Sequence, residues 1–103
     1  MYDIKTNIIK VYGKNIDSFF QNIITNDITR LGYDNSIYTA ILSPQGKYLY
    51  DFIMIKNDQY ILLETNENKV SGLIEEIKRY DLRSDINLSI EKNLVTKVVI
   101  KEE

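Results

Sequence analysis

The chain has 103 residues, of which 44% are hydrophobic and 27% are charged, and its formal net charge is −2. This length and composition are typical of one ordinary globular domain. The absence of Cys and His excludes disulfides, thiolate chemistry, histidine bases and the usual ligands of zinc or iron–sulfur clusters. The acidic balance argues against DNA and RNA as partners, because nucleic-acid binders neutralise phosphates with a basic surface.

The first elements are a strand and a helix. Residues 7–12 form a short β-rich run that ends at Gly13. Asn15 is a candidate N-cap for a helix whose apolar residues recur every three or four positions. Thr25, Asn26 and Asp27 should end that helix, because their side chains compete for backbone hydrogen bonds. The apolar stripe of this helix is Ile16, Phe19, Phe20, Ile23 and Ile24.

The middle of the chain predicts three consecutive strands, over residues 37–42, 47–55 and 59–64. Residues 43–46, Ser-Pro-Gln-Gly, suit a type I turn between the first two strands. A second helix is expected from Thr65 or Asn66 to about Tyr80. Two more β-like runs follow, over residues 86–90 and 95–100. This order predicts an α+β fold of the split βαβ (ferredoxin-like) type, an antiparallel sheet with two helices on one face.

The strand over residues 47–55 is apolar on both faces, whereas a strand with one wet face alternates apolar and polar residues. One face should carry Tyr48, Tyr50, Phe52 and Met54, and the other Leu49, Asp51, Ile53 and Ile55. Helices can cover one face only. The other face therefore needs a further domain, a partner chain or a ligand, and without that cover the chain should self-associate.

Asp51 is a lone carboxylate in an apolar row, and burying it ionised without a partner would cost several kcal/mol. One interpretation is that Asp51 reaches Lys, Arg or loop amides at the sheet edge. The other is that it hydrogen-bonds the N–H groups of a pterin or similar heterocycle. The chemistry alone favours the first interpretation.

Three segments resemble the YgfZ family of folate-binding iron–sulfur cluster assembly factors, which is related to the T-protein of the glycine cleavage system. The segments are residues 19–27 (FFQNIITND), residues 42–51 (LSPQGKYLYD), and residues 62–64 (LLE) followed by residues 78–84 (KRYDLRS). They occur in the family's order over almost the whole chain. The resemblance implies that residues 1–103 are the folate-binding N-terminal domain of a longer protein.

The resemblance also implies a cofactor and site residues. Members of the family bind tetrahydrofolate between domains and support maturation of iron–sulfur proteins, including an enzyme that thiolates tRNA. Carried over by position, the folate-binding residues are Asp51, Tyr50, Asn26 and Thr25, with no catalytic residue and no metal ligand in this chain. For Tyr50 the alternative is a core aromatic, and for Thr25 and Asn26 it is simple helix termination.

Two features depart from the family. The hallmark "K-G-C-x-x-G-Q-E" loop is absent, because the chain has no Cys. T-proteins also carry a paired "D-D" where this chain has Tyr50 and Asp51, which argues against aminomethyl transfer. The implied function is therefore a folate-binding domain that is not itself an enzyme. The alternatives are an aminomethyltransferase domain and a ferredoxin-like module whose aromatic strand face docks a partner.

The implied partners are the missing C-terminal domains or a partner chain, and iron–sulfur assembly proteins. No apolar run approaches the roughly 20 residues that span a bilayer, so no membrane contact is expected. Residues 1–3, Met-Tyr-Asp, lack the order of a signal peptide. We expect a location in the bacterial cytoplasm, with the mitochondrial matrix as the alternative.

Overall fold

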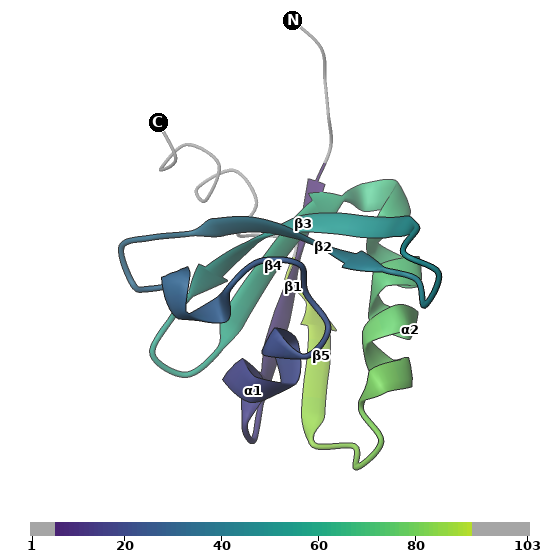
Figure 1. Cartoon of the computed structure of the whole chain (residues 1–103). Coiled ribbons are helices and arrows are strands. Elements are labelled where there is room, and N and C mark those ends of the chain that lie inside the picture. Colours follow the sequence, from purple (N-terminus) through teal and green to yellow (C-terminus); the bar gives the residue numbers. More distant parts are fainter. Residues whose placement is uncertain (1–5, 92–103) are drawn as a thin grey trace, which may run out of the picture.

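The structure is a computed structural model that describes residues 6–91 (Figure 1). The predicted strand over residues 95–100 lies outside this range. In chain order the elements are β1 (Thr6–Gly13), α1 (Ile16–Gln21), the 3₁₀ turn η1 (Ile28–Arg30), β2 (Ile37–Leu42), β3 (Tyr48–Lys56), β4 (Ile61–Asn66), the 3₁₀ turn η2 (Glu67–Lys69), α2 (Val70–Tyr80) and β5 (Ile86–Ile90).

The described strands form one antiparallel sheet in the order β2-β3-β4-β1-β5. Without the edge strand β2, the order β3-β4-β1-β5 is that of a split βαβ fold, because β1 lies in the middle of the sheet between β4 and the last strand, β5. The predicted α+β class and ferredoxin-like pattern are therefore confirmed. The strand β2 extends this pattern at one edge.

Both helices pack on the same face of the sheet, as predicted, and the core lies between these two layers (Figure 1). Burying each large apolar side chain contributes about 1.5–3 kcal/mol, so this layer supplies most of the stability of the fold. The fully buried members of the core are Phe20 of α1, Leu73 and Ile77 of α2, and Ile9, Val11, Ile41, Phe52, Met54 and Leu63 of the sheet.

The two faces of β3 differ. Phe52 and Met54 are buried under the helices, whereas Leu49, Ile53 and Ile55 on the other face are only half-buried. Among residues 6–91 no helix covers that second face, which we call the open face (Figure 1). The open face is the side on which the sequence predicts additional cover.

A β-bulge in β3 places Tyr48 on the face opposite to the predicted one. Ile41 pairs with Tyr50, but Leu42 pairs with Tyr48, so Leu49 is an extra residue on β3. Bulges of this kind interrupt the alternation of side chains along a strand. Tyr48 therefore lies on the open face with Asp51, and the prediction that it shares a face with Tyr50 is wrong.

The first helix is shorter than predicted. Asn15 has a left-handed backbone (φ 54°) and makes no side-chain cap, and α1 ends at Gln21. Its periodicity continues through Ile23 and Ile24, whose N–H groups still bond to the carbonyl of Phe20, but from Ile24 onward the backbone pairs with β2, since Ile24 forms a bridge with Ile41 and the N–H of Thr25 donates to Ala40. Tertiary pairing with a sheet edge has overridden the local helical pattern.

The second helix ends at Tyr80 as predicted, but α2 itself begins only at Val70, because the residue predicted as its cap, Asn66, caps the 3₁₀ turn before it. The side chain of Asn66 accepts a hydrogen bond from the backbone N–H of Asn68 at 2.8 Å, and η2 leads into α2, which ends at Tyr80. In residues 6–91, no helix combines the length and the apolar character needed to cross a membrane.

Gly72 lies inside α2, where glycine costs about 1 kcal/mol relative to alanine. The reason is steric. A Cβ atom at this position would clash with the hydroxyl group and ring of Tyr50. Gly72 therefore allows α2 to approach the tyrosine that β3 directs into the helix layer.

We predict that Gly72→Ala destabilises the chain by about 1–3 kcal/mol, because the clash outweighs the gain in helix propensity. Chemical denaturation measures the free energy of unfolding. Ser71→Ala, at the exposed neighbouring position, is the control and should leave stability unchanged or slightly raised. A Gly72→Ala variant that is more stable than the wild type would contradict the steric explanation.

Candidate functional site

Asp51 lies at a hollow of about 420 Å³ on the open face of the sheet. The hollow crosses four strands, because its walls come from β1, β2, β3 and β4. Thr6, Tyr38, Asp51, Ile53, Glu64 and Asn66 are the open-face residues that line it.

The carboxylate of Asp51 is held by tyrosine hydroxyls. Tyr38 donates a hydrogen bond to Oδ2 of Asp51, and the hydroxyl oxygen of Tyr48 lies 3.3 Å from that of Tyr38. The register explains this contact: Tyr38 pairs with Ile53, two residues from Asp51 on the same face, so its long side chain reaches diagonally to the carboxylate. The favoured interpretation was that Asp51 reaches a Lys, an Arg or loop amides. That interpretation is wrong, because within residues 6–91 the side-chain hydrogen-bond partners of Asp51 are tyrosine hydroxyls.

The ionised form of Asp51 is the stable one. Partial burial opposes ionisation, but hydrogen bonding to the hydroxyls of Tyr38 and Tyr48 outweighs it and lowers the pKa of Asp51. The positive charge of Lys69 adds a smaller effect in the same direction. The pKa of Tyr48 is raised, first by its hydrogen bonding to Asp51 and then by that to Tyr38. At neutral pH the site is thus a carboxylate beside neutral phenols.

Glu64 is a second carboxylate at the same hollow, and the sequence did not single it out as a site residue. It lies on β4 opposite Ile53 of β3 and Ile8 of β1, and only 5% of its surface is exposed. The hydroxyl of Thr6 donates a hydrogen bond of 2.8 Å to its Oε2. The signal that could have revealed Glu64 is the one that revealed Asp51, an acid within an apolar strand.

Thr25 and Asn26 do not line the hollow. They hold the edge of the sheet at β2: Thr25 exchanges hydrogen bonds with the backbone of Ala40, and the amide of Asn26 donates to the carbonyl of Tyr38 at 3.0 Å. The buried hydroxyl of Thr39 also accepts from the backbone N–H of Asn26 at 3.1 Å. These two residues therefore support the strand that carries Tyr38.

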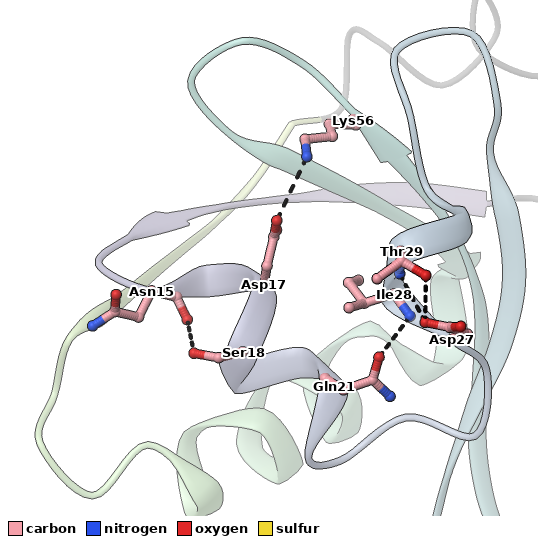
Figure 2. Close-up of polar contacts among 8 residues, drawn as sticks. All are labelled: Asn15, Asp17, Ser18, Gln21, Asp27, Ile28, Thr29 and Lys56. Carbon is pink, nitrogen blue, oxygen red and sulfur yellow. Dashed lines mark hydrogen bonds and ion pairs between the residues drawn. The ribbon is translucent and has the colours of Figure 1, made fainter.

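The segment around Thr25 and Asn26 is anchored at both ends (Figure 2). Gln21 of α1 accepts from the backbone N–H of Ile28 at 2.8 Å, and Asp27 caps η1 by accepting from the N–H and the hydroxyl of Thr29. These bonds to Thr29 lower the pKa of Asp27. Asp17 forms an ion pair with Lys56 of β3 at 3.6 Å, which ties α1 to the sheet.

Tyr50 lies on the opposite face from Asp51, against Gly72 of α2, and is half-buried beside the core. The structure does not bring it to the hollow. Of the four residues carried over from the family, only Asp51 lines it, and a folate contact of each remains a prediction.

Another hollow, of about 490 Å³, lies between α1 and the turn that joins β3 to β4. Its lining includes Asp17 and Lys56, which already neutralise one another. None of the site residues expected from the sequence lines it. We therefore take the Asp51 hollow as the candidate site.

We predict a pH dependence of stability that comes from Asp51. Its pKa is lowered on folding, so the carboxylate stabilises the fold above its ordinary pKa of 3.8, and this contribution is lost as pH falls through the folded pKa. Melting temperatures of the wild type and Asp51→Asn should differ at neutral pH and converge in acid. A difference that stays constant from neutral pH to about pH 2 would contradict this assignment.

Known proteins with similar sequences are iron–sulfur assembly factors and aminomethyltransferases. The chain is 34% identical over 90 residues to the mitochondrial iron–sulfur cluster assembly factor IBA57 homolog of Neurospora crassa, and this match covers 81% of this chain and 20% of that protein. The chain is 32% identical over 104 residues to an aminomethyltransferase of Prochlorococcus marinus, and that match covers 100% of this chain and 26% of that protein. No protein-family model matches the chain.

A solved structure shares the fold. The glycine cleavage system aminomethyltransferase T from Bartonella henselae superposes with a TM-score of 0.74 over 84% of this chain and 24% of that protein, at 17% sequence identity. The chain thus spans only 20% to 26% of the length of these relatives. It is homologous to the IBA57-type iron–sulfur cluster assembly factors and to the aminomethyltransferases, and it has the fold of part of a glycine cleavage T-protein.

Proposed function

We propose that this chain provides a tetrahydrofolate-binding surface, centred on Asp51, within a protein that supports iron–sulfur cluster assembly. The observation that carries the proposal is the ionised carboxylate of Asp51 at a hollow on the face of the sheet that no helix within residues 6–91 covers. The relatives named as assembly factors support the biological role.

The chemistry of the hollow fits the pterin part of folate. An ionised carboxylate only accepts hydrogen bonds, so its ligand must donate them, and a reduced pterin has an amino group and ring N–H groups along one edge. Tyr38 and Tyr48 are 61% and 58% exposed, and their rings offer flat apolar surfaces beside the carboxylate.

The rest of the ligand requires surroundings from outside these residues. The described hollow is open, and the relatives are four to five times as long as the stretch that matches. We propose that the further domains of such a protein, or a partner chain, close the hollow over the folate. Iron–sulfur assembly proteins are the proposed partners, in the cytoplasm of a bacterium or in the mitochondrial matrix.

The direct test is a titration of the full-length gene product with tetrahydrofolate. Ligand at about 100 times its dissociation constant should stabilise the protein by about 2.7 kcal/mol, which a thermal melt detects. Asp51→Asn should weaken binding by about 10–100-fold, because hydrogen bonds to a charged acceptor contribute about 1.5–3 kcal/mol.

Asp58→Asn is the matched control, since this carboxylate lies at the other hollow, beside the turn between β3 and β4. It should bind tetrahydrofolate as tightly as the wild type. The proposal fails if the full-length protein does not bind tetrahydrofolate, or if the two Asn variants bind it equally well.

Aminomethyl transfer to tetrahydrofolate is the second candidate, favoured by the aminomethyltransferase that matches 100% of this chain. A turnover assay of the full-length protein separates the two. Tetrahydrofolate binding without aminomethyl transfer is expected for the assembly role, whereas turnover that Asp51→Asn abolishes would establish the enzyme.

A further inference from the structure

Tyr48 reaches the site only through the irregularity of β3. Because Leu49 is the extra residue of the bulge, Tyr48 pairs with Leu42 and lies on the same face as Asp51 and Tyr38. Its ring is 58% exposed, so burial in the core does not explain its position. Its hydroxyl lies 3.3 Å from that of Tyr38 and also hydrogen-bonds to Asp51.

The direction of these hydrogen bonds follows from the number of protons. A phenol has a single hydrogen to donate, and Tyr38 donates it to Oδ2 of Asp51. In the pair of hydroxyls, the oxygen of Tyr38 therefore accepts and Tyr48 donates, while the carboxylate of Asp51 competes for the same Tyr48 hydrogen. The result is a hydrogen-bond chain of two phenols and one carboxylate, in which Tyr48 acts on Asp51 both directly and through Tyr38. Each bond in such a chain polarises the next and strengthens it.

We propose that Tyr48 is a positioning residue for Asp51, which acts both directly and through Tyr38. It stabilises the ionised carboxylate and fixes its orientation on the open face. A carboxylate held in this way meets a ligand as a hydrogen-bond acceptor only. The site should therefore prefer ligands that donate N–H groups, and this consequence rests on the proposed function. The hydrogen-bond chain itself does not depend on that function.

The test is a pH titration of the Asp51 carboxyl carbon by NMR in the unliganded 103-residue chain, with Asp51→Asn used to assign the signal. Tyr48→Phe keeps the ring and removes the hydroxyl, so the midpoint of the Asp51 titration should move to higher pH. Tyr38→Phe should move it further, because it removes the direct donor. In the Tyr38→Phe background, the effect of Tyr48→Phe on the midpoint should differ from its effect in the wild type, because the two hydroxyls contact one another.

Tyr33→Phe is the control, because Tyr33 is 64% exposed and lies outside the hollow; it should leave the Asp51 midpoint unchanged. A structural role for Tyr48 alone would lower the melting temperature without moving this midpoint. The proposal is overturned if Tyr48→Phe does not shift the midpoint, or if its effect is the same with and without Tyr38. Since no ligand is added, neither outcome depends on folate binding.

Discussion

The hydrogen bond between Tyr38 and Asp51 resolves a conflict that the sheet would otherwise contain. A carboxylate in an apolar row loses part of its hydration, and burial alone would raise its pKa. The chain has no basic side chain next to it on β3, and the charge of Lys69 makes only a small contribution. Hydroxyl groups from the neighbouring strand supply the stabilisation, so the ionised state depends on the register between β2 and β3.

That register depends in turn on the edge of the sheet. An edge strand has one side without a strand partner, and it can shift or pair with another chain. Here residues 24–27 occupy that side, with backbone pairing between Ile24 and Ile41 and a bond from the Asn26 amide to the Tyr38 carbonyl. The caps and ion pair around α1 hold this segment in place (Figure 2). Residues remote from the hollow thus fix the position of the tyrosine that faces it.

Much of the fold could be predicted because it follows from local patterns. The turn over residues 43–46 and the strands on either side of it agree with the structure to within a residue, since apolar alternation and turn chemistry act over short distances. The first helix was predicted too long because its apolar period continues beyond Gln21, and only pairing with a distant strand ends it. Sequence periodicity contains no information about that pairing.

The site was harder to predict for the same reason. The acid in an apolar strand identified Asp51, and the same reasoning applied to residues 61–66 would have identified Glu64. Tyr38 could have been found by pairing the two strands across the predicted turn, because residue 42 opposite residue 47 sets Tyr38 opposite Asp51; the observed register makes the two diagonal neighbours on the same face. Tyr48 could not have been found in this way, since a bulge changes the face of a residue without changing the composition of the strand.

The geometry also limits the functional conclusion that can be drawn from Tyr50, the residue before Asp51. Neighbouring residues on a regular strand point to opposite faces, and Tyr50 lies under α2 against Gly72 while Asp51 faces the hollow. An acid in place of Tyr50 would, on this backbone, enter the helix layer and not the hollow. The absence of a second acid next to Asp51 is therefore weak evidence against aminomethyl transfer. In this structure the second carboxylate of the hollow comes from β4, as Glu64, so pairs of residues across strands, and not neighbours in sequence, determine the chemistry of this surface.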